Sequence, residues 1–96
     1  MKQPLINKIL EARIVAIIRG ITGEDFNDLI HTLVDNDIRI MEVTVDTPGV
    51  YEKIEQIKTE YDTQVVIGAG TVLDSETARP AISAGAEFLV TPSLNI

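Results

Sequence analysis

Four short runs of mostly aliphatic residues punctuate the chain, and a stretch with helical periodicity follows each of the first three. The runs are 14–18, 38–45, 64–67 and 86–90, and their centres recur roughly every 22 to 26 residues. Strands that alternate with helices of this length are typical of βα units, whose strands pair in parallel. The pattern therefore predicts an α/β fold of four parallel βα units with the last helix missing.

Capping residues indicate where the first two helices begin. Thr22 followed by Asp25 has the spacing of a capping box, and an apolar stripe follows it at helical intervals. Thr47 followed by Pro48 predicts an N-cap with proline at the first helical position. Both signals lie directly after predicted strands, as a βα unit requires.

Further signals bound a third helix and indicate an extra one. Asp74 or Ser75 is expected to open the third helix, and Gly85 to end it. Pro80 lies inside that pattern and is expected to kink or shorten the helix. The apolar residues of segment 1–12 predict a short helix before the first strand.

No linker or change of composition divides the chain, so residues 1–96 are predicted to form one domain. Within it, 1–12 is the extra helix and 13–96 the four βα units. Four parallel strands leave two sheet edges with unpaired backbone groups. Three explanations remain open: the natural chain continues past Ile96, two copies associate to cover the edges, or the chain is a complete small open sheet.

Composition narrows the function classes. Fifteen acidic and eight basic residues give a net charge of −7, which disfavours nucleic acid and anionic membranes as partners. The chain has no cysteine and a single histidine, His31, so neither a disulfide nor a metal site is expected, and no cofactor is implied. No apolar run approaches a membrane span and the start of the chain does not resemble a signal peptide, so a cytoplasmic protein is expected.

Polar residues gather where the predicted strands end, and in parallel sheets function collects at these carboxyl ends. They are Arg19 and Gly20, then Glu42, Thr44 and Asp46, then the segment 68–71, and finally Thr91, Pro92 and Ser93. This edge of the sheet is therefore the predicted functional site.

Glu42 is the strongest candidate for catalysis, because it lies within a strand that otherwise reads as buried. Alternation places it on one face with Ile40, Thr44 and Asp46, which is expected to be the face away from the helices. Burial should raise the pKa of Glu42 and so suit it to proton transfer near neutral pH. The alternative is a glutamate paired with an arginine only for packing.

The other candidates are ambiguous from the residues alone. Segment 68–71 is expected to form a glycine-rich strand-to-helix turn, in which Thr71 offers a hydroxyl to a ligand; a tight turn without a ligand explains it equally well. Arg19 is either an anion ligand or the partner of an internal salt bridge. Pro92 either belongs to the site or simply ends the fourth strand.

Four strings together resemble the 2-keto-3-deoxy-6-phosphogluconate (KDPG) and 4-hydroxy-2-oxoglutarate (KHG) aldolase family. They are IVAIIR at 14–19, EVT at 42–44, GAGTV at 68–72 and AGAEFLVTP at 84–92. Each string is weakly specific, but their order and spacing match the family over almost the whole chain. The resemblance implies a (β/α)8 barrel of roughly 200–250 residues, of which this chain is about the first half.

The resemblance also implies a class I aldolase that cleaves KDPG or KHG to pyruvate and an aldehyde. Glu42 is then the acid/base that moves protons through a water, and Thr71 and Pro92 contact the pyruvate portion of a small keto-acid substrate. The family often has an arginine where this chain has Asp46, so Arg19 becomes the candidate cation for the substrate carboxylate. Full-length relatives suggest a homotrimer, whereas a half-barrel could instead form a homodimer.

The Schiff-base lysine of the family belongs to a Lys-Phe-Phe-Pro-like string that this sequence lacks. Its four lysines, Lys2, Lys8, Lys53 and Lys58, lie in the amino-terminal segment or in the second predicted helix. The 96-residue chain alone is therefore expected to be inactive. The alternative is a non-catalytic half-barrel scaffold that self-associates through its open strand edges.

Overall fold

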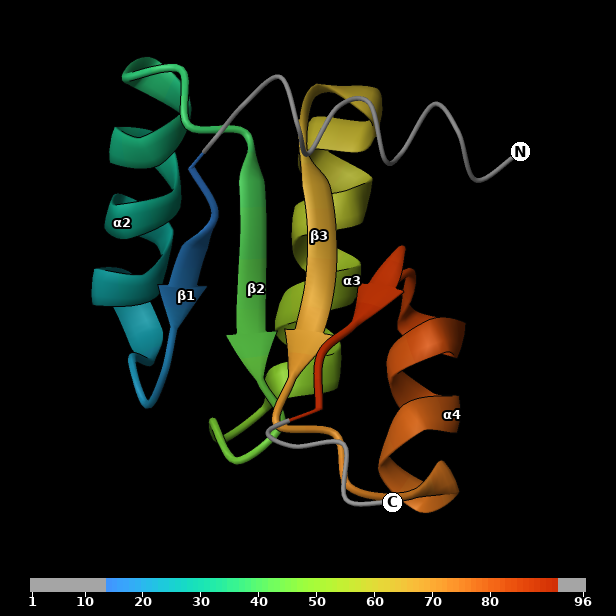
Figure 1. Ribbon diagram of the computed structural model, residues 1–96. Helices are drawn as coiled ribbons and strands as arrows, with labels where there is room; N and C mark the ends of the chain where they lie inside the picture. The colour runs from blue at the N-terminus through green and yellow to red at the C-terminus, as the bar shows by residue number, and fades with distance from the viewer. Residues whose placement is uncertain (1–13, 92–96) are drawn as a thin grey trace.

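The computed structural model describes residues 14–91 and contains a parallel sheet with the strand order β1-β2-β3-β4 (Figure 1). In chain order the elements are β1 (Ala16–Ile18), α2 (Gly23–Asp35), β2 (Ile40–Thr44), α3 (Val50–Tyr61), the 3-10 helix η1 (Asp62–Gln64), β3 (Val66–Gly70), α4 (Ser75–Ala84) and β4 (Phe88–Leu89). The predicted alternation of parallel strands and helices is confirmed.

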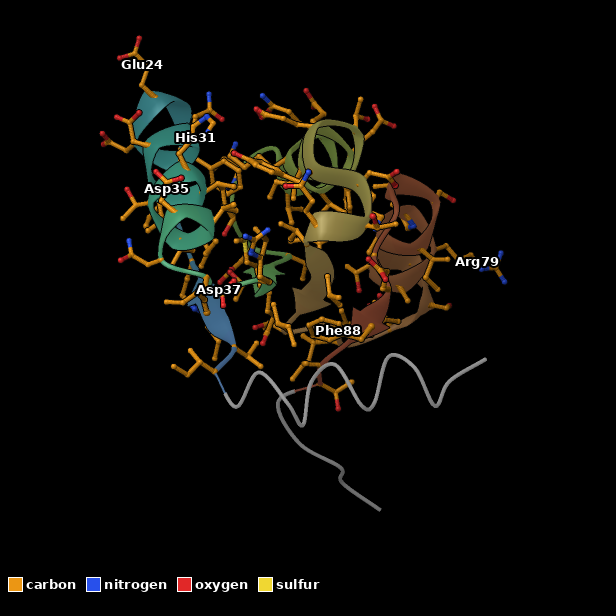
Figure 2. The ribbon with its side chains drawn as sticks, turned by 90° about the horizontal axis from the view of Figure 1, so that it is seen from above. Glu24, His31, Asp35, Asp37, Arg79 and Phe88 are labelled. Carbon is orange, nitrogen blue, oxygen red and sulfur yellow. The ribbon has the colours of Figure 1, made fainter. Side chains whose placement is uncertain are left out.

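All three helices cover the same face of the sheet, as the view from above shows (Figure 2). Alternate residues of the central strands point into this layer: Met41 and Val43 from β2, and Ile67 and Ala69 from β3, all completely buried. They meet the apolar stripes of the helices, whose most buried members are Phe26, Ile30, Ile54, Ile57 and Ala81. The core is thus a single layer between the sheet and its helices.

The opposite face of the sheet is the one that bears the polar residues of β2. Glu42 and Thr44 alternate with the core residues and lie outside the core cluster, which confirms the predicted division of the strand. One row across this face is set by the strand register, in which Ile17, Glu42, Gly68 and Phe88 are successive partners. We call this helix-free side the open face.

The predicted bounds of the third strand were wrong. It was expected at 64–67, but β3 spans Val66–Gly70 and Gln64 belongs to η1. The segment 68–71 is therefore not a strand-to-helix turn, since Gly68 and Gly70 lie within the sheet. Glycine in a strand often marks a close approach by a neighbouring group, and both glycines are covered by side chains of adjacent strands.

Thr22 occupies the predicted N-cap position of α2, although its side chain makes no capping hydrogen bond. The prediction for Thr47 was wrong, because α3 begins at Val50 and its N-cap is Gly49 in the left-handed conformation (φ 69°). The Thr47 hydroxyl instead accepts a hydrogen bond from the Gly20 amide, at 2.9 Å. The hydroxyl group that was expected to cap α3 is therefore engaged in a tertiary hydrogen bond.

The bounds of α4 follow its local signals closely. Asp74 is the N-cap and accepts a hydrogen bond from the Thr77 amide, and Gly85 ends the helix in the left-handed conformation (φ 118°). Pro80 lies inside the helix, which continues to Ala84, so the expected shortening does not occur. Among residues 14–91, no helix is both long enough and apolar enough to cross a membrane.

The predicted helix at 1–12 and the candidate Pro92 lie outside the described residues. The carboxyl ends of β1, β2 and β3 are described, and the parallel register brings them to one edge of the sheet. The candidate site lies along this edge and the adjoining part of the open face.

Candidate functional site

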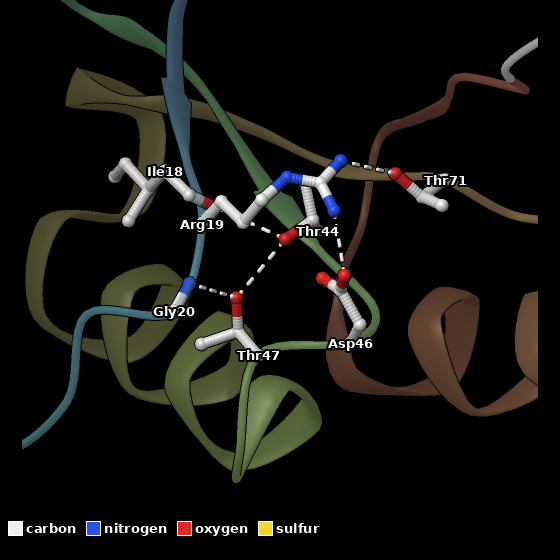
Figure 3. Close-up of polar contacts among 7 residues, drawn as sticks. All are labelled: Ile18, Arg19, Gly20, Thr44, Asp46, Thr47 and Thr71. Atoms are coloured by element: carbon white, nitrogen blue, oxygen red, sulfur yellow. Dashed lines mark hydrogen bonds and ion pairs between the residues drawn. The ribbon is translucent and has the colours of Figure 1, made fainter.

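An arginine joins the ends of three strands at the carboxyl edge of the sheet (Figure 3). Arg19, directly after β1, donates from Nη1 to the Asp46 carboxylate at 2.6 Å and from Nη2 to the Thr71 hydroxyl at 3.0 Å. Asp46 lies two residues after β2, and Thr71 directly follows β3. The structure thus brings together two predicted ligand residues, Arg19 and Thr71, around a carboxylate of the same chain.

The backbone of Thr71 is in the left-handed region, with φ of 60°. A β-branched residue rarely adopts this conformation, which costs of order 1–3 kcal/mol. Such strain persists where the surrounding structure imposes it, and it tends to occur at functional sites. Here the strained residue is the one whose hydroxyl meets Arg19.

Hydrogen bonds of two threonine hydroxyl groups connect the backbone segments at this edge of the sheet. The Thr44 hydroxyl lies 3.0 Å from that of Thr47 and 3.5 Å from the Ile18 carbonyl oxygen, and Thr47 accepts from the Gly20 amide. These contacts tie the loop after β1 to the loop after β2, as Figure 3 shows. The sequence suggested no such role for Thr47, because its position before Pro48 resembled a helix cap.

Arg19 and Asp46 remain accessible, with side-chain exposures of 57% and 54%. The Thr44 hydroxyl and, to a smaller extent, the Arg19 guanidinium lower the pKa of Asp46. An exposed pair of this kind contributes little stability, because solvent screens the two charges. Its main effect is to hold the guanidinium at the carboxyl edge of the sheet.

Glu42 is 6% exposed and lies on the open face of β2. Its side chain leans over Gly70, so that a Cβ atom at Gly70 would overlap the Glu42 carboxyl group. Burial raises the pKa of Glu42, and the positive charge of Arg19 opposes this rise. A carboxyl group with a raised pKa, at a site that also holds a cation, is suited to proton transfer.

The packing-only alternative for Glu42 required an ion pair with an arginine. In the described part of the chain, the arginine ion pairs are formed with aspartates: Arg19 pairs with Asp46, and Arg39 with Asp37. Glu42 therefore takes no part in those bridges. The internal salt bridge considered for Arg19 does exist, and its partner is Asp46.

The raised pKa of Glu42 predicts how stability depends on pH. Because the folded chain holds this proton to a higher pH than the unfolded chain does, its free energy of unfolding should fall as the pH rises from the ordinary glutamate range through the raised pKa. Glu42→Gln removes this loss. The free energy of unfolding of the variant minus that of the parent chain should therefore be more positive at about pH 7 than at about pH 4. Urea unfolding at both pH values measures the difference.

A matched control is Glu55→Gln, at an exposed position of α3, which removes a charge but no buried carboxyl group. An advantage of Glu42→Gln that is the same at both pH values, or larger at the acidic one, would contradict the assignment.

The remaining candidates lie away from this edge. His31 contacts the Tyr61 hydroxyl through Nδ1 at 2.9 Å, linking α2 to α3 on the helix-covered side. Residues 14–91 contain no group of three or more histidine, aspartate or glutamate side chains placed to hold a metal ion. The glycines of β3, by contrast, contribute to the site because they leave space for neighbouring side chains, a role that their sequence pattern did not indicate.

Both lysines of the described residues belong to α3 and make contacts outside the site. Lys53 donates to the Pro48 carbonyl oxygen at 2.8 Å and lies over the Phe26 ring. Lys58 pairs with Glu87 at 2.6 Å. Since α3 covers the face opposite to Glu42, neither amine reaches the open face near that carboxyl group.

Comparison with known proteins gives consistent results. Residues 5–96 match the sequence model of a family described as KDPG and KHG aldolase. The chain is 34% identical over 93 residues to a 2-dehydro-3-deoxy-phosphogluconate aldolase of Haemophilus influenzae, covering 97% of this chain and 43% of that protein. It is 40% identical over 83 residues to the protein of the same name from Treponema pallidum, covering 86% and 39%.

A solved structure shows the same arrangement of strands and helices. The 2-keto-3-deoxy-6-phosphogluconate aldolase of Zymomonas mobilis, crystallised with 3-phosphoglycerate, superposes with a TM-score of 0.80 at 30% identity. The match covers 99% of this chain and 44% of that one. The chain therefore spans about two fifths of the length of the relatives it matches.

Proposed function

The chain belongs to the KDPG and KHG aldolase family, and on that premise we propose that its site carries part of a class I aldolase reaction. The reaction is the cleavage of KDPG or KHG to pyruvate and an aldehyde. The observation that carries the proposal is Glu42, a buried carboxyl group with a raised pKa at the edge where Arg19 and Thr71 meet.

Glu42 is assigned the proton transfers. In a class I aldolase the keto group of the substrate condenses with a lysine amine and releases water, and the protonated imine then accepts the electron pair of the breaking carbon–carbon bond. Through a bound water, Glu42 takes the proton of the substrate hydroxyl as the aldehyde forms. It then returns a proton to the enamine carbon of the pyruvate portion. A carboxyl group whose pKa is raised toward neutrality can perform both transfers.

Arg19 is assigned to the carboxylate of the keto acid, with Thr71 and Pro92 beside the pyruvate portion. A guanidinium has five N–H donors, and two of those of Arg19 are engaged by Asp46 and Thr71. Within residues 14–91 its guanidinium has no other hydrogen-bond partner, so the remaining donors can bind a second carboxylate at this exposed side chain. Asp46 then holds the arginine in place, although it also weakens its net positive charge.

The lysine that forms the Schiff base is proposed to lie outside this chain, which by itself is then inactive. Lys53 and Lys58 are held on α3, and Lys2 and Lys8 lie outside the described residues. Reduction with borohydride in the presence of pyruvate tests this. No stable adduct is expected on any of the four lysines, and an adduct on one of them, found by mass spectrometry, would overturn the assignment.

Binding of pyruvate tests the keto-acid site separately. Weak, millimolar binding is expected, with NMR shifts at Arg19, Thr71 and Glu42 in the parent chain. In Arg19→Ala the shifts at Thr71 and Glu42 should disappear. The control is Arg79→Ala, which removes an arginine of α4, outside the proposed site. Pyruvate shifts that are absent at all three residues, or that survive Arg19→Ala, would sink the proposed function.

The exposed strand edges favour a second candidate, a scaffold that self-associates. Ile17 of β1 is 66% exposed, and Leu89 and Val90 at the β4 edge are partly exposed. Unpaired edges with apolar side chains favour pairing with another strand. Sedimentation of the purified chain distinguishes the two: a discrete dimer that is unaffected by pyruvate supports the scaffold, and a monomer excludes it.

A further inference from the structure

The two glycines of β3 leave two vacancies on the open face, and side chains from the two neighbouring strands fill them. A Cβ atom at Gly68 would overlap three carbon atoms of the Phe88 ring, which comes from β4. A Cβ atom at Gly70 would overlap the Cγ, Cδ and Oε1 atoms of Glu42, which comes from β2. Both side chains therefore lie directly against the β3 backbone.

The strand register shows that the Glu42 side chain does not cover its own partner residue on β3. Glu42 is paired with Gly68, not with Gly70, in the ladder between β2 and β3. A side chain that stood over its own partner would occupy the vacancy at Gly68. That place is taken, because Phe88 is the partner of Gly68 on the other side and its ring covers the glycine.

The Glu42 side chain instead leans two residues along β3, onto the last residue of the strand. In a parallel sheet this direction leads to the carboxyl edge, where Arg19 contacts Thr71 next to Gly70. The charge of Arg19 acts on Glu42 at this position. The displacement along the strand therefore brings the carboxyl group toward the other polar residues of the site.

We propose that Phe88 is a positioning residue for Glu42: its ring occupies the space over Gly68 and thereby directs the carboxyl group over Gly70, toward the carboxyl edge of the sheet. The side chain acts by exclusion and not by contact with a substrate. Its relevance to catalysis rests on the proposed function, whereas the placement of Glu42 does not.

NMR can report which glycine the carboxyl group covers. In the parent chain the Hα and amide signals of Gly70 should titrate with the same midpoint as the Glu42 carboxyl carbon, and those of Gly68 should respond weakly. In Phe88→Ala the space over Gly68 opens, so the titration amplitude at Gly70 should fall about twofold or more while that at Gly68 rises. The Glu42 midpoint should also move down, since the vacated space admits water.

Three further variants make the result decisive. Phe88→Leu keeps an apolar side chain but removes the flat ring, and should give a smaller change of the same sign even if Phe88→Ala does not fold. Gly68→Ala added to Phe88→Ala refills the space with a methyl group and should return the amplitude to Gly70. Leu89→Ala removes a neighbouring apolar side chain whose partner Ala69 faces the core, and should change neither glycine titration.

An undiminished Gly70 amplitude in the folded Phe88 variants would overturn the proposal, as would a loss in Leu89→Ala equal to theirs. The titration contains no keto acid, so its failure removes only the role of Phe88. A failure of pyruvate binding, by contrast, removes the proposed function and leaves this geometry intact.

Discussion

Replacing Ile54 by alanine is expected to lower the free energy of unfolding by about 2–5 kcal/mol. Ile54 is completely buried, on the face of α3 that packs against the core residues of the sheet. Its truncation removes apolar burial and leaves a cavity, because close-packed neighbours relax only in part. A chain of this size is commonly stable by only about 5 kcal/mol or slightly more, so this loss is a large part of its total stability.

Urea unfolding followed by circular dichroism measures this loss. The matched control is Ile82→Ala, the same substitution in α4 at a side chain that is 57% exposed. It should change stability by less than about 0.5 kcal/mol. Equal losses at the two positions would contradict the described core, since they would mean that α3 does not bury Ile54 against the sheet.

Gly70→Ala is expected to destabilise the chain by about 1–3 kcal/mol through a clash with Glu42. The added Cβ atom would overlap the Glu42 carboxyl group, which lies in a buried position between two strands. Gly70 is not among the glycines with positive φ, so alanine there carries no backbone penalty. The predicted cost therefore comes from the carboxyl group that the glycine accommodates.

A double-mutant cycle isolates this contact. In a Glu42→Ala background the space over Gly70 is free, so Gly70→Ala should cost little or nothing there. Gly68→Ala is the control, because its new Cβ atom meets the Phe88 ring, and Glu42→Ala should not relieve its cost. If Gly70→Ala costs the same with and without the Glu42 side chain, the close approach of the two residues is wrong.

Local signals in the sequence were sufficient for most of the fold. The aliphatic runs located all four strands, and the spacing between them gave the parallel alternation with helices. Asp74 and Gly85 fixed both ends of α4, because a cap and a left-handed stop act within a few residues. Alternation along β2 correctly assigned Met41 and Val43 to the core face and Glu42 to the other.

The errors occurred where a distant residue decided the local structure. Segment 68–71 resembled a turn because glycine is rare inside strands, yet Glu42 and Phe88 fill the space that the missing side chains leave. Thr47 resembled a cap, but its hydroxyl receives the Gly20 amide across the sheet edge. All three partners lie far away along the chain, so no local pattern could reveal them.

The sequence by itself determined the class of fold and the edge at which the polar residues collect, because hydrophobic periodicity and parallel strand order act along the chain. It also singled out Glu42, since a carboxyl group inside an aliphatic strand is costly without a reason. Only the tertiary structure decided that Arg19 pairs with Asp46, that Thr71 meets the same guanidinium, and that the Glu42 carboxyl group lies over Gly70. These are contacts between strands, and their geometry depends on register and on the volume of neighbouring side chains, which the order of residues along one strand does not specify.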